Sequence, residues 1–307
     1  MEVILDASGA TLTQLEHAIL GYTAKYANRY NITVYAFAIE GNHLHLVAQV
    51  NDGNRFAFMR DLKSSIAKAI PRYTPSHPGG TVWGRRYSNE FLPAPDDIEE
   101  RFFYTVLQPV QDGLVESISE YPGYNCFHDA IWGIPRTFEI VNWTSYNEAL
   151  RWNPKARPID FKETYTLEYA RLPGYEHLSR EEYAHLMSTR LEQRCQDIVA
   201  KRRAARKGFA GRRALLKVRQ GSRPRTTKVS TRDSRRPRVL SVCPKRRAEA
   251  SAWYFSIYFE YKVASEQYRR GNYEACFPPG TYKPYLPPEG NQSSGINSNR
   301  CIPDISR

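Results

Sequence analysis

The sequence predicts an α+β protein, with a small antiparallel sheet that has helices on one face and a basic extension behind it. Three observations indicate this class. Strand-like alternation and helical spacing follow one another up to about residue 130. Between Lys201 and Arg247 there are 19 Lys and Arg residues and one acid, Asp233, although the formal net charge of all 307 residues is only +12. From Cys276 the chain is rich in Pro, Gly and Ser.

The first four strands are expected from apolar, β-rich stretches bounded by turn residues. The second and third are separated by Gly41-Asn42, a pair typical of a hairpin turn. The fourth contains a Trp and a basic-aromatic run and is read as a strand or hairpin. The four stretches are residues 2–7, 31–41, 43–50 and 81–92.

Three helices are expected between these strands from residues that recur on one face. We expect a Thr to cap the first helix, Pro71 to end the second, and Asp96 or Asp97 to cap the third before Pro109 stops it. The three stretches are residues 11–30, 54–73 and 94–110. The resulting order β-α-β-β-α-β-α suits a small sheet with helices packed on one face.

The remainder of the chain predicts less regular structure. Residues 131–178 have weak periodicity and are expected to be an irregular accessory segment. Ser179 and Glu182 stand at capping-box spacing, so a long helix should begin there and lead into a basic, low-complexity segment that is partly disordered. An aromatic stretch over residues 250–270 fits either a strand or a helix. We therefore divide the chain into four segments, residues 1–130, 131–178, 179–250 and 251–307.

Composition excludes several classes of protein. The five cysteines form no CxxC pair and their number is odd, which argues against a disulfide framework and a cysteine zinc site. No apolar run approaches the roughly 18 residues that span a bilayer, and the first residues lack the pattern of a signal peptide. The expected location is therefore cytoplasmic and nucleoid-associated, with no membrane partner.

The stretch "GNHLHLV" places His43 and His45 on the same side of a predicted strand, because strand side chains alternate between faces. Two imidazoles so placed can converge on one metal ion if a third ligand lies nearby. The alternative is a partly exposed, inert face. A local positive block of +18 indicates a polyanionic partner, most often nucleic acid.

Four motifs in order make the chain resemble a known family. They are "AIEGNHLHLVAQV", "MRDLKSSIAKAI", "VWGRRYSNEFL" and "FFYTVLQPVQDGLVESISEYPGYN". Together they resemble the single-tyrosine HUH transposases, and in particular the REP-associated and insertion-sequence-200-like branches. The resemblance covers roughly residues 1–127 and implies a ferredoxin-like sandwich.

The resemblance implies a metal-dependent endonuclease and strand transferase that cuts single-stranded DNA through a 5′-phosphotyrosine intermediate. Tyr104 would be the nucleophile, and Mg²⁺ or Mn²⁺ would be held by His43, His45 and Gln108. Glu40, three residues before His43, is either a further metal ligand or a charged turn residue. Tyr104 and Gln108 are four residues apart on a predicted helix and so face the same way. The competing interpretation of Tyr104 is a packed core aromatic.

Two groups of residues are expected to contact DNA. The first lies in the family-like region, where cations would hold phosphates and aromatic rings would stack on unpaired bases; it comprises Lys63, Trp83, Arg85, Arg86 and Tyr87. The second lies in the basic extension and comprises Arg202, Arg203, Arg206, Arg212 and Arg213. The expected partner is single-stranded or hairpin DNA.

Two other functions stay open at this point. The protein can be a domesticated DNA-binding protein that recognises hairpin repeats without cleaving them, or a metal phosphohydrolase unrelated to DNA. A homodimer that exchanges the tyrosine helix is a further possibility. An intact His, His, Tyr and Gln set argues against a pure binding protein, since binding does not need those groups.

Overall fold

The computed structural model describes residues 3–5, 11–41, 43–84, 86–218 and 238–284 of the chain. It consists of two compact units, residues 1–248 and 249–307. The α+β class is confirmed, with small antiparallel sheets and helices in the first unit. The strands are β1 Val3–Leu5, β2 Thr11–Thr13, β3 Ile32–Glu40, β4 His43–Val50, β5 Arg136–Val141 and β6 Lys162–Leu167.

The α-helices of the described residues follow the chain as α1 Gln14–Arg29, α2 Arg55–Tyr73, α3 Pro95–Val106, α4 Gln108–Gln111, α5 Phe127–Trp132, α6 Trp143–Ala149, α7 Arg180–Ala204, α8 Arg212–Leu216 and α9 Pro244–Arg269. Short 3-10 turns lie at Ile118–Glu120 and Pro158–Phe161. The 250–270 stretch, for which sequence left strand or helix open, is helical. None of the helices in the described part of the chain is both long and apolar enough to cross a membrane.

The β3–β4 hairpin lies at the centre of the first unit. Gly41 adopts a φ of 53°, which an L side chain rarely accepts, so the turn expected there is formed. On its other edge β3 meets a second segment, because Ile39 N–H donates to the Tyr124 carbonyl at 3.1 Å and Cys126 N–H donates to the Phe37 carbonyl at 3.2 Å. Pairing on both edges explains why nearly every side chain of β3 is buried.

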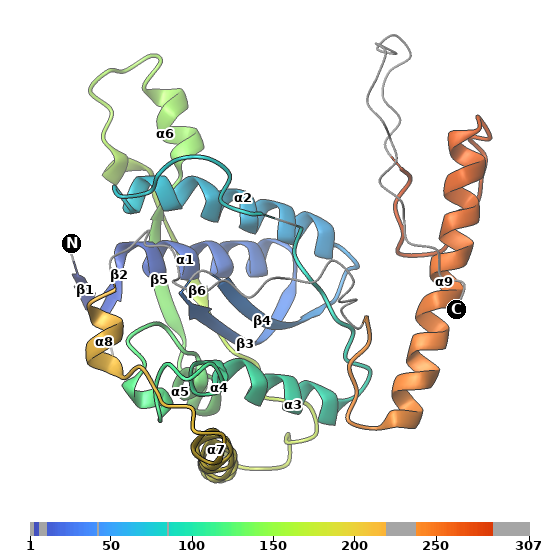
Figure 1. Cartoon of the computed structure of the whole chain (residues 1–307). Coiled ribbons are helices and arrows are strands. Elements are labelled where there is room, and N and C mark those ends of the chain that lie inside the picture. Colours follow the sequence, from blue (N-terminus) through green and yellow to red (C-terminus); the bar gives the residue numbers. More distant parts are fainter. Residues whose placement is uncertain (1–2, 6–10, 42, 85, 219–237, 285–307) are drawn as a thin grey trace. The chain divides into compact units, whose positions relative to one another are not determined.

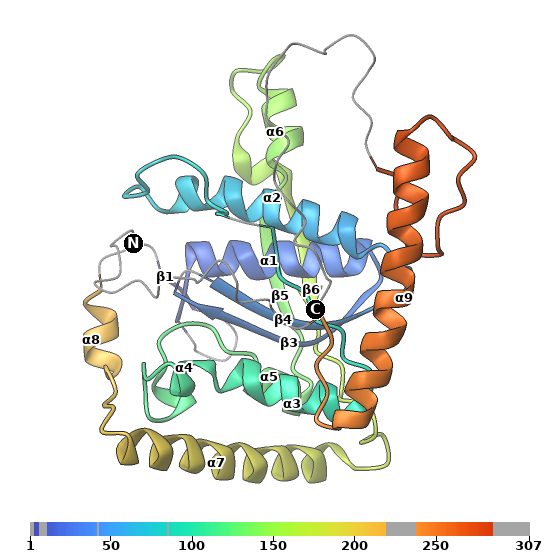
Figure 2. The same ribbon diagram turned by 45° about the vertical axis from the view of Figure 1, so that its right-hand side comes forward.

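Helices cover both faces of this hairpin. The sequence predicted all three helices on one face, but only α1 and α2 pack together there, while α3 lies across the other face (Figure 1). Helix α7 runs along the outer side of α3, α4 and α5 (Figure 2). The core is continuous through these layers and includes Leu20, Phe37, Ile66 and Phe103, each at most 1% exposed.

Local signals set the starts of the long helices. Thr13 caps α1 in a reciprocal capping box with Glu16, and Ser179 caps α7 in another with Glu182. Helix α3 differs from the prediction: Ala94 is its N-cap and Pro95 its first residue, so Asp96 and Asp97 lie in the first turn instead of capping it.

Two helix ends that were expected at prolines lie elsewhere. Helix α2 continues through Pro71 to Tyr73, because a proline in the last turn removes only one hydrogen bond. Helix α3 already ends at Val106, and Pro109 sits inside the following short helix α4. The bond that Pro109 cannot donate is therefore lost at the junction of two helices.

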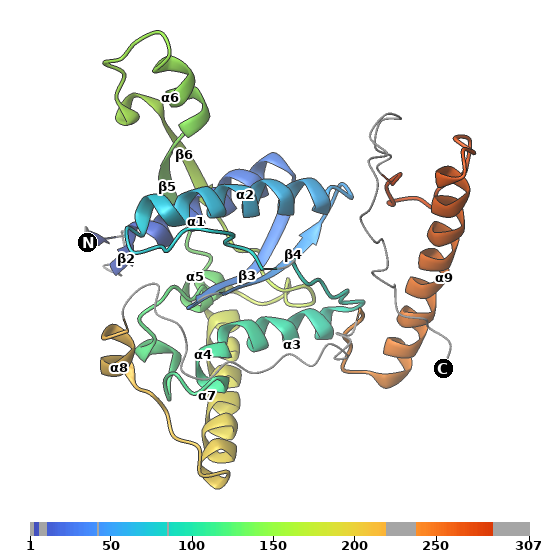
Figure 3. The same cartoon turned by 45° about the horizontal axis from the view of Figure 1, so that its top comes forward.

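Two segments differ from their predicted secondary structure. The described residues of the stretch 81–92 form no strand: among them, Phe91 makes an isolated bridge with Val239. Residues 131–178, expected to be irregular, contain the β5–β6 hairpin with α6 between its strands, and the hairpin packs against α1 (Figure 3). The basic stretch 219–237 and the tail from 285, both expected to be disordered, lie outside the described residues.

Candidate active site

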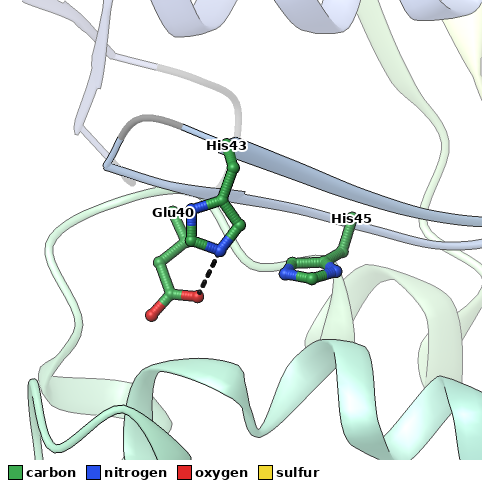
Figure 4. A group of neighbouring side chains, drawn as sticks. All are labelled: Glu40, His43 and His45. Atoms are coloured by element: carbon green, nitrogen blue, oxygen red, sulfur yellow. Dashed lines mark ion pairs between the residues drawn. The ribbon is translucent and has the colours of Figure 1, made fainter. Parts of the chain in front are cut away.

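Strand pairing brings three of the predicted ligands together. Glu40 and His43 are direct cross-strand partners in the β3–β4 hairpin, and His45 pairs with Ala38 two positions along. Cross-strand partners and residues two apart share a face of the sheet. The ligand atoms of Glu40, His43 and His45 therefore all lie within 4.8 Å of one another, and Figure 4 shows the three side chains converging below the hairpin.

Electrostatics couple these groups. The Glu40 carboxylate is 3% exposed, and its Oε2 lies 3.4 Å from His43 Nε2. This contact raises the pKa of His43 above its usual value, against the opposing effect of burial, and Asp112 adds to the rise. Burial, with the nearby Glu40 charge, also raises the pKa of Tyr121 to about 12. The carboxylate thus dominates the local field.

Helix α3 places Tyr104 beside the histidines. Its ring meets the His45 ring edge-on, with centroids 5.8 Å apart and an angle of 79° between the planes. The Arg101 guanidinium, one turn earlier, lies 4.3 Å from the centre of the Tyr104 ring. Phe102 and Phe103 are 1% and 0% exposed and supply the core face, which leaves the half-buried Tyr104 on the side of the site.

Gln108 opens α4, and Leu107 separates it from the end of α3 at Val106, so Tyr104 and Gln108 do not lie on one helix as the sequence predicted. It is 7% exposed, and its Oε1 is buried without a hydrogen-bond partner in the described part of the chain. Asp112, which caps the end of α4, is close enough to His43 to affect its pKa. The α3–α4 pair therefore runs along the histidine side of the hairpin.

These residues fit a divalent cation. Glu40 Oε1 and Gln108 Oε1 are buried acceptors with no hydrogen-bond donor among the described residues, and such atoms are costly unless a ligand or ion satisfies them. A carboxylate, an amide oxygen and two imidazoles form a donor set that divalent metals accept. The structure thus offers a possible metal site formed by Glu40, His43 and His45, with Gln108 as a further candidate ligand.

The predicted DNA contacts near the hairpin are partly brought together. Lys63 Nζ lies 5.0 Å from the centre of the Trp83 ring, and Trp83 Nε1 donates to the Lys63 carbonyl at 2.9 Å. Burial lowers the pKa of Lys63, and the charge of Arg86 lowers it further. Arg86 is exposed and Tyr87 half-buried. Arg85 lies outside the described residues.

The basic extension has two kinds of arginine. Arg202 donates to the Gln111 and Gly208 carbonyls at 2.8 and 2.9 Å, and Arg203 pairs with Glu116 at 2.9 Å. Arg212 makes a longer bond of 3.4 Å to the Glu120 carbonyl. Arg206 and Arg213 are exposed. The first arginines thus fasten α7 and α8 to the core, a role that charge counting did not reveal.

Two neighbours of the site were missed from sequence. Arg101 precedes Tyr104 by three residues and Asp112 follows Gln108 by four, so helical spacing alone would have placed each beside its neighbour. A third feature, the contact of residues 238–246 with the start of α3, has no sequence signal because the two segments are far apart in the chain.

The first unit is thus a mixed α/β structure. In it, a hairpin with a His-x-His motif faces a tyrosine on a helix. Residues 10–91 match the family described as "Transposase IS200 like". This part of the chain is therefore similar to the IS200-like transposases. The matched residues include His43 and His45 and end before Tyr104.

A similar protein supports the same family. A protein of Haemophilus influenzae that carries the name REP-associated tyrosine transposase is 23% identical over 135 residues, which is 41% of this chain and 76% of that protein. No solved structure matches the chain.

Proposed function

We propose that this protein is a transposase, a metal-dependent endonuclease and strand transferase that cuts single-stranded, hairpin-associated DNA, with Tyr104 as its nucleophile. The observation that carries the proposal is the contact between the rings of Tyr104 on α3 and His45 on β4, whose centroids lie 5.8 Å apart. Glu40 and His43 converge on His45 from the same hairpin. A transposase must break phosphodiester bonds, and this is where a nucleophile and candidate metal ligands meet.

The residues have distinct roles in this proposal. The Tyr104 oxygen attacks the phosphorus and forms a phosphotyrosine bond to the 5′ side, while the bond to the 3′ oxygen breaks. The phenol loses its proton, and the 3′ oxygen gains one. A divalent cation held by His43, His45, Glu40 and Gln108 supplies stabilisation of the charge that develops on the phosphate oxygens. The retained ester bond then allows a second strand to be joined.

The other predicted contacts support a nucleic-acid substrate. Lys63 and Trp83 pair a cation with an aromatic ring beside the exposed Arg86, a combination that suits a strand with phosphates and unpaired bases. Arg206 and Arg213 are exposed on the extension and are proposed to hold phosphates further along the DNA. Because Tyr104 and His45 of one chain already meet, the proposed centre needs no helix from a second copy.

The test is covalent capture. The protein is incubated with labelled, hairpin-bearing single strands and Mn²⁺ or Mg²⁺, and denaturing gels reveal any protein–DNA adduct. We expect an adduct that EDTA abolishes, that Tyr104→Phe and His45→Ala lack, and that Tyr273→Phe, at an exposed tyrosine of the second unit, retains. An adduct in Tyr104→Phe would disprove the nucleophile. DNA binding that ignores EDTA, with no adduct, would instead favour a non-cleaving hairpin-binding protein.

A further inference from the structure

Residues 238–246, here called the strap, fasten onto the chain just before the tyrosine helix. Phe91 N–H donates to the Arg238 carbonyl at 2.8 Å, and Leu240 N–H donates to the Phe91 carbonyl at 3.0 Å. Val239 between them is 3% exposed. The strap thus pairs with Phe91 as a short parallel bridge and buries an apolar side chain there.

The strap also grips the first turn of α3. Val242 N–H donates to Asp97 Oδ1 at 2.8 Å, and Arg246 makes a two-bond contact with Asp96 at 2.5 and 2.8 Å. Paired bonds of this kind fix orientation as well as position. These bonds therefore fix the position of the strap relative to α3, the helix that carries Tyr104.

Between the strap and α3 there is a pocket of about 200 Å³, and Tyr104 lines it. Leu92, Leu240 and Val242 form its apolar walls, and Arg101 supplies a cation. The pocket is smaller than the roughly 300–1,000 Å³ of sites for drug-sized ligands. A single planar ring system therefore suits it better than an extended ligand.

The two acidic residues at this pocket each have a partner, so they repel an anionic ligand less than two free carboxylates would. Asp97 accepts the bond from the strap, and Glu100 is paired with Arg194 at 2.6 Å. Arg101 instead lies over the Tyr104 ring, on the side of the proposed nucleophile. The pocket thus combines apolar walls with a cation next to the atom that would attack phosphorus.

We propose that this pocket binds one unpaired nucleobase next to the phosphate that Tyr104 attacks, and that the strap determines how well the base fits. The proposal rests on the function proposed above. Leu92, Leu240 and Val242 enclose the base, and Arg101 lies near its phosphate. The strap is then a part of the substrate site contributed by a segment more than a hundred residues away from the tyrosine.

The test couples a change in the pocket to a change in the DNA. Val242→Trp fills the pocket, and a set of oligonucleotides carries an abasic residue at each position around the cleavage site. Dissociation constants are measured in the Tyr104→Phe background so that no cleavage intervenes. In the parent we expect one abasic position to weaken binding by about fivefold to a hundredfold, the range that roughly 1–3 kcal/mol of stacking per base gives.

The informative result is the loss of the difference in dissociation constant between intact and abasic strands. With Val242→Trp, intact and abasic strands should bind equally, whereas with Val263→Trp, at a valine of similar exposure on α9, the difference should persist. If Val242→Trp loosens the strap, Leu240→Ala serves as a second variant. It widens the pocket, so it should also reduce the loss of affinity that an abasic residue causes.

Two outcomes separate the two proposals. An abasic effect that is unchanged by both pocket variants would overturn the base pocket even if the covalent adduct forms at Tyr104. An absence of adduct in every protein would instead overturn the proposed cleavage, while the abasic scan of the bound strand would still report whether the pocket holds a base.

Discussion

Replacement of Glu40 by Gln should weaken metal binding while leaving the metal-free protein at least as stable. The carboxylate is 3% exposed, and its Oε1 has no hydrogen-bond partner in the described part of the chain. His43, 3.4 Å from Oε2, compensates the carboxylate charge only when the imidazole is protonated, so at a pH where His43 is neutral that charge is poorly compensated without a cation. Gln keeps the shape and removes that charge. The same substitution therefore has opposite effects on the empty and the loaded protein.

The size of the effect follows from the ligand spacing. The three ligand atoms lie within 4.8 Å of one another, and a divalent cation bound among them would lie closer than that to the carboxylate. The attraction at 4.8 Å, about 1.7 kcal/mol with the screening of bulk water, is therefore a lower limit. This corresponds to an affinity weaker by at least roughly twentyfold. At a metal concentration of 100 times the parent dissociation constant, the stabilisation should fall from about 2.7 to about 1 kcal/mol or less.

The assay is thermal and chemical unfolding at increasing Mn²⁺, with calorimetric titration for the dissociation constants. Glu148→Gln, at an exposed glutamate of α6, is the matched control and should bind Mn²⁺ like the parent. Mn²⁺ binding by Glu40→Gln as tight as that of the parent would refute the assignment of Glu40 to the metal site. A large loss of stability without metal would refute the account of its burial.

Three further predictions concern the frame around the site. Burial opposes ionisation of Glu163, but bonds led by that from Lys25 outweigh it and lower the Glu163 pKa; Glu163→Gln should therefore cost about 1 kcal/mol at pH 7, and in urea unfolding this difference should shrink as the pH falls through the lowered pKa of native Glu163, below its ordinary value of 4.5. Gly21→Ala should destabilise by about 1–3 kcal/mol despite better helix propensity, because the new Cβ would lie 2.3 Å from Ile140 Cγ2; an unchanged melting temperature would contradict this packing of α1 on β5. Phe103→Ala should cost about 3–5 kcal/mol in denaturant unfolding, since the side chain is fully buried, and a loss below 1 kcal/mol would show that α3 is not held there.

Local signals predicted the part of the fold that local forces decide. The caps of α1 and α7, the β3–β4 hairpin and the shared face of its histidines all follow from residues a few positions apart. The position of Glu40 beside His43 also follows from the hairpin register. By contrast, the expectation that Tyr104 lies near His45 was based on a family resemblance, and the ring contact now supports it. The catalytic and ligand roles of these residues stay predictions.

The failures have a common cause in tertiary context. Residues 81–92 carry strand-like side chains, but among the described residues of this stretch Phe91 alone pairs as in a strand, and its partner, Val239, lies far along the chain. In β5 the alternation of buried Phe138 and Ile140 with exposed neighbours was a usable signal, yet the strand forms because β6 and α1 cover it. Charge counting likewise could not show that Arg202 and Arg203 bind groups of the same chain, the Gln111 carbonyl and the Glu116 carboxylate.

The hairpin has a consequence for how the proposed site forms. All three clustered donors come from six consecutive residues, 40–45, so gathering them requires only a tight reversal of the backbone and almost no chain entropy. The three donors therefore need only the β3–β4 turn to come together, whereas Tyr104 reaches them through the tertiary packing of α3 on the hairpin. On the proposed function, the metal ligands and the nucleophile would thus depend on different levels of folding.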